Sequence, residues 1–105
     1  MIIYNVTTNI AEEVEVKWLH WMRTEHIPAV LATGNFMSAR LVRVLVEEEM
    51  GGATYAAQYT ANDKEDLQKY YNHDAPKLRE EAIALFGDKM LAFRTELEVL
   101  EDFVV

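Results

Sequence analysis

The sequence predicts an α+β fold with the element order βαββαβ. Two helical stretches begin and end at equivalent residues, Asn9 to Gly34 and Asn62 to Gly87, with an offset of 53 residues at both ends. A strand-like run lies before and after each stretch. Two β-α-β units with right-handed crossovers give a four-stranded antiparallel sheet with two helices on one face, which is the ferredoxin-like arrangement.

Length and composition fit a single acidic domain. The chain has 105 residues, half of them hydrophobic, so we expect one domain over residues 1–105 with its own core. The formal net charge is −8, from 18 acidic and 10 basic residues. A field of that sign repels phosphate backbones and anionic lipid surfaces, so no nucleic acid and no membrane is expected as a partner.

The cysteine content and the N-terminal residues limit the chemistry and the cellular location that we expect for this protein. There is no cysteine, which excludes disulfides, thiol nucleophiles and cysteine-ligated metal centres. Residues 1–5 have neither a basic region nor a long apolar core, and no apolar run approaches the roughly 18 residues of a membrane span. A cytoplasmic protein is therefore expected.

The first β-α-β unit begins with a strand over residues 2–8, which are rich in β-branched and aromatic side chains. Asn9 is expected to cap the following helix, with Glu12 closing a capping box. Apolar residues then recur at four-residue steps, as on one face of a helix: Val14, Trp18 and Met22.

Pro28 interrupts this helical pattern. It lacks the amide that would bond to the Thr24 carbonyl, so it should kink or end the helix. A last short turn over residues 29–33 leads to Gly34, a plausible left-handed stop.

The middle of the chain is expected to form two strands. Residues 36–46 form the second strand, whose two faces are both largely apolar, which predicts cover on both sides. The segment Met50-Gly51-Gly52 makes the turn into a third strand over residues 53–61.

The second helical stretch is expected to start at Asn62. Asp74 and Pro76 resemble an internal restart, with Asp74 as a new cap, and Gly87 ends the stretch. Residues 89–100 form the fourth strand, followed by a short tail. The buried stripe of this stretch is expected to contain Leu67, Tyr70, Tyr71, Leu78 and Phe86.

The predicted topology leaves the second face of the sheet bare and partly apolar. Such a face is an association surface, and two sheets packed about 10 Å apart would bury it. We therefore expect a homodimer formed through the sheet face, with about 800 Å² or more buried per partner.

Several segments resemble a known family. The run Tyr70–Pro76 on the second helix is similar to a segment of many dimeric α+β barrel proteins. The chain as a whole resembles a family of small uncharacterised bacterial proteins in that superfamily, a domain of unknown function. The segments that carry this resemblance are residues 1–7, Trp18–Met22, His26–Pro28, Ala32–Gly34 and Ala92–Thr95.

This resemblance implies a dimeric α+β barrel and names no activity. The wider superfamily includes cofactor-free monooxygenases, isomerases and haem enzymes, and its ligands often lie in the cleft between helices and sheet. Fold likeness alone is a weak basis for function.

The histidines are the first candidates for chemistry. His26 extends the first apolar stripe beside the Pro28 break, and His73 lies beside the Pro76 restart. In a functional interpretation both face one cleft as acid, base or substrate anchor. In a structural interpretation, which we favour, each satisfies backbone groups freed at a helix break. His20 lies off the stripe and should be exposed.

Polar strand residues are the second candidate group. Asn5 and Gln58 are equivalent in the repeat and share strand parity. Arg94 is either a carboxylate-binding arginine in a pocket or, as favoured, half of an interface ion pair with Glu96. Buried polar groups must be paired, so some of these residues should form a network.

Aromatic residues are the third group, and at helical spacing they usually belong to the core. The alternative to a core role is an aromatic wall for a flat ligand, formed by the set Trp18, Trp21, Tyr55, Tyr59, Tyr70 and Tyr71. Trp18, Met22 and Tyr71 are the candidate ligand-binding residues of the cleft. No metal motif occurs, because His20, Glu25 and His26 do not share a helix face. Axial haem ligation by His26 or His73 is disfavoured, and no cofactor is expected.

These observations lead to a small-molecule-binding homodimer with a cleft between helices and sheet. The first alternative is a cofactor-independent monooxygenase or isomerase acting on a small aromatic or quinol substrate, with His26 or His73 as base. The second is a non-enzymatic dimeric interaction module, in which Trp18, Met22, Tyr71 and Leu78 fill the cleft.

Overall fold

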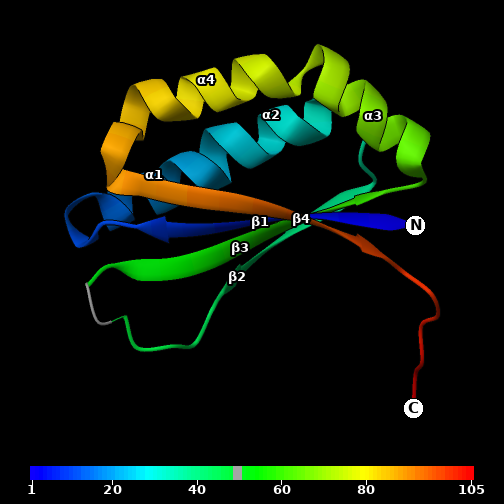
Figure 1. Cartoon of the computed structure of the whole chain (residues 1–105), viewed down its shortest axis with the longest axis horizontal. Coiled ribbons are helices and arrows are strands. Elements are labelled where there is room, and N and C mark those ends of the chain that lie inside the picture. The colour runs from blue at the N-terminus through cyan, green and yellow to red at the C-terminus, as the bar shows by residue number, and fades with distance from the viewer. Residues whose placement is uncertain (49–50) are drawn as a thin grey trace.

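A computed structural model describes residues 1–48 and 51–105 of the chain. The strands are β1 (Ile2–Ile10), β2 (Ser38–Arg43), β3 (Ala53–Ala61) and β4 (Met90–Glu98). The helices are α1 (Glu15–Trp21), α2 (Ile27–Ala32), α3 (Lys64–His73) and α4 (Ala75–Phe86), with short turns η1 (Glu12–Val14), η2 (Met22–His26) and η3 (Gly87–Lys89). All helices cover one face of the sheet (Figure 1).

The sheet confirms the predicted ferredoxin-like topology. Its order is β2-β3-β1-β4 with antiparallel pairing throughout, so the chain's first strand lies in the centre. Even-numbered residues of β1 face the helices and form part of the core, while odd-numbered residues face away. Tyr4, one of the helix-facing residues, lies directly opposite Tyr59 and Glu96.

Both predicted asparagine caps are wrong. Asn9 lies within β1, where its side-chain amide donates to Thr54 Oγ1 (3.3 Å), and η1 begins after Ala11 without a side-chain cap. Strand β1 continues through Ile10 because β3 and β4 pair with it on both sides to that point. In the second stretch the cap is Asp63, which accepts from the Asp66 amide (2.9 Å), one residue beyond Asn62.

Pro28 changes the hydrogen bonding of the first helix without ending it. The turn η2 is a π-helical turn, in which the Ile27 amide donates to the Met22 carbonyl five residues back. Helix α2 then starts with Pro28 in its first turn, where a missing amide costs nothing. The Thr24 hydroxyl donates to the His20 carbonyl (2.8 Å), satisfying a group that the wider turn leaves free.

The two edge strands are shorter than predicted. Strand β2 covers 38–43 rather than 36–46, and β4 covers 90–98 rather than 89–100, because each pairs on one side only. Phe36, expected at the start of a strand, is instead a buried core residue packed on Tyr70 (ring centroids 4.9 Å apart).

Turns and restarts mostly follow the prediction. Gly34 and Gly87 have positive φ and end α2 and α4. Met50 lies outside the described residues, but Gly52 has φ +78° and a side chain there would collide with the Ile10 carbonyl. Asp74 joins α3 to α4 as predicted, yet caps nothing, and accepts from the Asn35 side-chain amide (3.1 Å).

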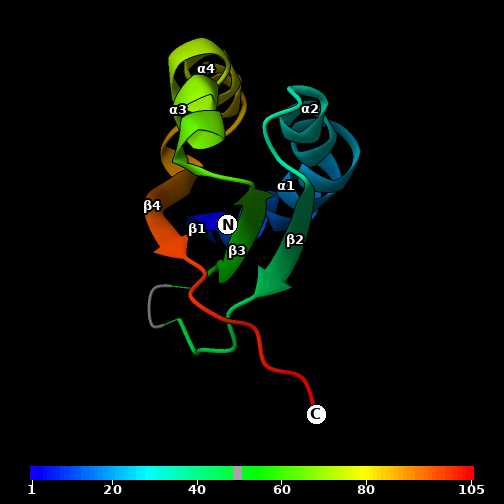
Figure 2. The ribbon, with the colours of Figure 1, turned by 90° about the vertical axis from the view of Figure 1, so that its right-hand side faces the viewer.

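The sheet face opposite the helices is uncovered in a single chain. The second strand was predicted to be covered on both of its faces, but this chain covers only one of them. Figure 2 shows the helices on one side only. Along β4 three of the four residues on this open face are apolar: Leu91, Phe93 and Leu97 are 73%, 61% and 42% exposed, and Thr95 is the fourth. The tail beyond β4 leads away from the sheet and is also exposed.

Candidate functional site

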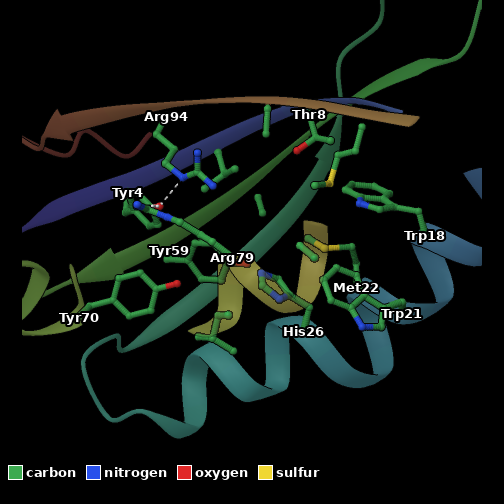
Figure 3. Close-up of a pocket in the computed structure, with 16 residues that line it drawn as sticks. Tyr4, Thr8, Trp18, Trp21, Met22, His26, Tyr59, Tyr70, Arg79 and Arg94 are labelled. Carbon is green, nitrogen blue, oxygen red and sulfur yellow. Dashed lines mark hydrogen bonds between the residues drawn. The ribbon is translucent and has the colours of Figure 1, made fainter. Parts of the chain in front are cut away.

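A cavity of about 50 Å³ lies between the helices and the sheet. Its walls come from β1 and β4 on one side and from the α1–η2 segment and α4 on the other (Figure 3). That volume holds a few water molecules, since one water needs roughly 10–15 Å³ measured in this way. Its apolar lining includes Trp18, Trp21, Met22, Leu78 and Ala82.

Two arginines converge on one phenol at the polar end of this cavity. Arg94 Nε of β4 donates to the Tyr4 hydroxyl (2.9 Å), and Arg79 Nη2 of α4 donates to the same oxygen (3.1 Å). Tyr4 is 2% exposed, whereas Arg94 reaches solvent. Within residues 1–48 and 51–105, no carboxylate forms an ion pair with either guanidinium.

The predicted pairing of Arg94 with Glu96 within one chain does not occur. Glu96 accepts instead from the Tyr71 hydroxyl (2.7 Å), and that contact together with burial raises the pKa of Tyr71. Among the described residues, the Tyr4 hydroxyl is the side-chain hydrogen-bond partner of Arg94, and Arg94 forms no ion pair there.

His26 lies at the end of the π-turn η2 and faces the cavity. Its ring stacks on Trp21 (centroids 4.6 Å apart, 25° between planes). Burial lowers the pKa of His26 to about 4, and the positive charge of Arg94 adds to this effect. The imidazole is consequently neutral at pH 7.

Three buried nitrogens of this cavity have no hydrogen-bond partner: Trp18 Nε1, His26 Nδ1 and Arg79 Nε. They are all the unpaired buried side-chain nitrogen and oxygen atoms among the described residues. Buried polar atoms are normally paired, so three exceptions lining one cavity mark it as unusual. The indole and guanidinium nitrogens can only donate, and the missing partner is therefore an acceptor.

The structure brings together four of the predicted site residues and separates the others. Trp18, Met22, His26 and Arg94 line the cavity. His73 is exposed at the end of α3, and His20 is exposed as expected. Tyr71 is not among the lining residues.

Asn5 and Gln58 are neighbours across β1 and β3, but on the open face of the sheet. The Asn5 side-chain amide donates to Thr7 Oγ1 (3.0 Å), so its polar contact is local. Neither residue reaches the cavity. The repeat correctly placed these two residues on the same face of the sheet. Alternation along a strand does not tell which of its two faces packs against the helices.

Sequence reasoning missed two important lining residues, Tyr4 and Arg79. For Arg79 a signal existed, because it falls on the same α4 face as buried Ala75, Ala82 and Phe86. An arginine in an otherwise apolar stripe is a candidate for a buried charge. For Tyr4 the signal is that it alternates with Ile2 and Val6 along β1, which places the three side chains on one face of the strand.

Metal chemistry and membrane insertion receive no support from the described part of the chain. No three histidine, aspartate or glutamate side chains there gather around a common point suited to a metal ion. None of the helices there has both the length and the apolar character needed to cross a bilayer.

Comparison with protein families gives one match over nearly the full length. The family described as "Domain of unknown function (DUF4286)" matches residues 1–100. No curated protein matches the sequence.

Solved structures share the fold at low sequence identity. A dimeric ferredoxin-like protein from an uncultured marine organism is 8% identical, with 97% of each chain covered and a TM-score of 0.73. A mutant of MhuD with two manganese protoporphyrin IX bound per active site is 17% identical, with 100% of each chain covered and a TM-score of 0.70. An EthD family protein from Bacillus halodurans C-125 is 17% identical, covering 93% of this chain and 100% of that one, with a TM-score of 0.66.

Proposed function

The chain belongs to the DUF4286 family, a domain of unknown function, and on that premise we propose that it is a homodimeric protein that binds a small organic molecule in the cleft between its helices and sheet. The observation that supports this most is the set of three unpaired buried nitrogens around one cavity. Each unpaired buried group costs about 1–3 kcal/mol. A ligand that pairs with them recovers that cost when it binds.

The composition of the cavity supports ligand binding. Its wall is mostly aromatic and aliphatic with a few polar side chains, as in pockets that bind small organic molecules. Trp18, Met22 and Leu78 leave about 50 Å³ between them and the sheet, so a ligand of the size of benzoate binds only if the side chains around the cavity move apart.

Two observations support the homodimer. The open sheet face exposes a row of apolar residues on β4, and a bare row of this kind is an association surface. The first structure compared above is described as a dimeric ferredoxin-like protein.

The enzymatic alternative rests on His26, a neutral imidazole with an unpaired nitrogen facing the cavity. A base whose conjugate acid has a pKa of about 4 is a weak proton acceptor at pH 7. This favours a binding role over proton abstraction, and His73, which is exposed, does not supply a second base.

A cavity-filling variant tests the proposed function. Ala82 is buried and lines the cavity, so Ala82→Met places a side chain where a ligand would bind. Ala84→Met is the matched control, because Ala84 is exposed on the same helix. Thermal unfolding is measured with small aromatic acids, their neutral amides and naphthoquinones.

We expect at least one compound to stabilise the wild-type protein and the Ala84→Met control, by roughly 2.7 kcal/mol at 100 times its dissociation constant. Ala82→Met should fold and lose this response. Equal stabilisation of all three proteins would place the binding site elsewhere and contradict the proposal.

A further inference from the structure

We propose that the cleft is selective for a small monoanion, a carboxylate on a compact aromatic or branched apolar body, held by Arg79 and Arg94 at the Tyr4 end of the cavity. This inference rests on the proposed function and names the class of its ligand. It concerns charge, which the proposed function leaves open.

The first support is an unbalanced pair of cations. Arg79 and Arg94 approach the same oxygen, Tyr4 Oη, so their guanidinium groups lie close together. Like charges this close repel each other, and within residues 1–48 and 51–105 no carboxylate forms an ion pair with either. The nearest acidic side chain on β4, Glu96, lies opposite Tyr4 but accepts from the Tyr71 hydroxyl and not from either arginine.

The second support is the direction of the free hydrogen bonds. Trp18 Nε1 and Arg79 Nε are donors only, and both are buried without an acceptor. Tyr4 accepts from both arginines and retains its own hydroxyl hydrogen to donate. At the Tyr4 end, the free hydrogen-bonding capacity of the two arginines and of Tyr4 is therefore donor capacity.

The third support is the match between this donor set and a carboxylate. Arginine binds the two oxygens of a carboxylate in a planar, two-point geometry. The opposite wall, formed by Trp21, Met22 and Leu78, suits an uncharged apolar body.

Matched acids and amides test this inference by calorimetry on the full-length protein. The pairs are benzoate with benzamide and 1-naphthoate with 1-naphthamide, which differ in charge but hardly in shape. We expect the acid of at least one pair to bind tenfold or more tightly than its amide. Added sodium chloride should weaken binding of the acid and leave the amide unchanged.

Two variants locate the anion. Arg79→Gln and Arg94→Gln should each reduce acid affinity tenfold or more and leave amide affinity unchanged. Because Arg94 is exposed, Arg94→Gln should fold, and it provides the test if Arg79→Gln does not fold. Arg23→Gln is the control, because Arg23 is exposed on η2 and does not line the cavity.

The outcomes separate the two proposals. Equal binding of acid and amide, unaffected by either arginine variant, would overturn the anion inference and leave small-molecule binding intact. Absence of binding by every acid and amide at millimolar concentration would overturn both.

Discussion

At the scale of single residues, the buried nitrogens that lack a hydrogen-bond partner among the described residues all line one cavity. Trp18, His26 and Arg79 each bury an unpaired nitrogen, and all three line the same cavity. Together they cost several kcal/mol, given about 1–3 kcal/mol for each. A small domain has a total stability of about 5–15 kcal/mol, so this is a substantial fraction. Such a cost is compatible with folding because the surrounding aromatic core is extensive.

His26 should make stability depend on pH. Its pKa is about 4 in the folded chain and 6.5 when unfolded, so between these values the unfolded chain binds a proton that the folded chain does not. The contribution of neutral His26 is therefore present above pH 6.5 and lost as the pH falls toward 4. Its size is at most about 3 kcal/mol.

Urea unfolding at pH 7.5, 6.0 and 5.0 measures this effect. The wild-type protein should lose more stability over this range than His26→Gln, because the acidic residues common to both cancel in the comparison. His73→Gln is the control, since His73 is exposed, and it should follow the wild type. Parallel curves for the wild type and His26→Gln would show that His26 is not buried in neutral form.

At the scale of elements, the repeat predicts order and topology but not the local ends of helices. Asn9 and Asn62 are equivalent in the repeat, yet neither caps a helix. The strand pairing of β1 extends to Ile10 and includes Asn9, while Asp63, next to Asn62, is the residue whose carboxylate reaches the Asp66 amide. The residue at which each helix begins depends on the pairing of neighbouring strands and on backbone angles. Spacing in the sequence gives no information about either.

Because sequence spacing does not contain tertiary neighbours, only some of the site residues could be predicted. Helical periodicity correctly grouped Trp18, Met22 and His26, because a π-turn keeps all three facing one cavity. His73 had an equivalent local argument, a histidine beside a helix restart, and yet is exposed. The apolar stripe of α4 could indicate that Arg79 is buried, but its contact with Tyr4, 75 positions away in the sequence, could not be predicted from helical spacing.

At the scale of the whole molecule, the two faces of the sheet have different roles. The helix-covered face contains the core and the cavity, while the open face presents an apolar row on β4. A chain of this length gains from burying such a row against a second copy, because small domains bury a limited fraction of their surface alone. The proposed dimer and the proposed cleft are therefore on opposite sides of the same sheet.

A charge on the open face should separate the dimer. Phe93 is 61% exposed in the single chain and lies at the middle of the β4 row, so Phe93→Lys would bury an unpaired charge in the interface. Light scattering after size exclusion at micromolar concentration should give a dimer for the wild type and a monomer for the variant. Ile83→Lys is the control, because Ile83 is similarly exposed, at 63%, but lies on α4.

A dimer that persists in Phe93→Lys would place the interface elsewhere, and a monomeric wild-type protein would contradict the homodimer. Far-UV circular dichroism of both variants checks that a change of assembly does not reflect loss of the fold.

The central claim, that the cleft is a ligand site, is tested most directly at the Trp18 indole. The chain has only two tryptophans, so the two indole N–H signals in a nitrogen-15 spectrum are assigned with Trp18→Phe. Because Trp18 Nε1 lines the cavity and has no hydrogen-bond partner within the described residues, a ligand in the cavity should shift its signal strongly. We expect titration with 1-naphthoate or benzoate to move the Trp18 signal saturably in the wild type and not in Ala82→Met; a signal that stays fixed at millimolar concentrations of every acid, amide and quinone tested would contradict the claim.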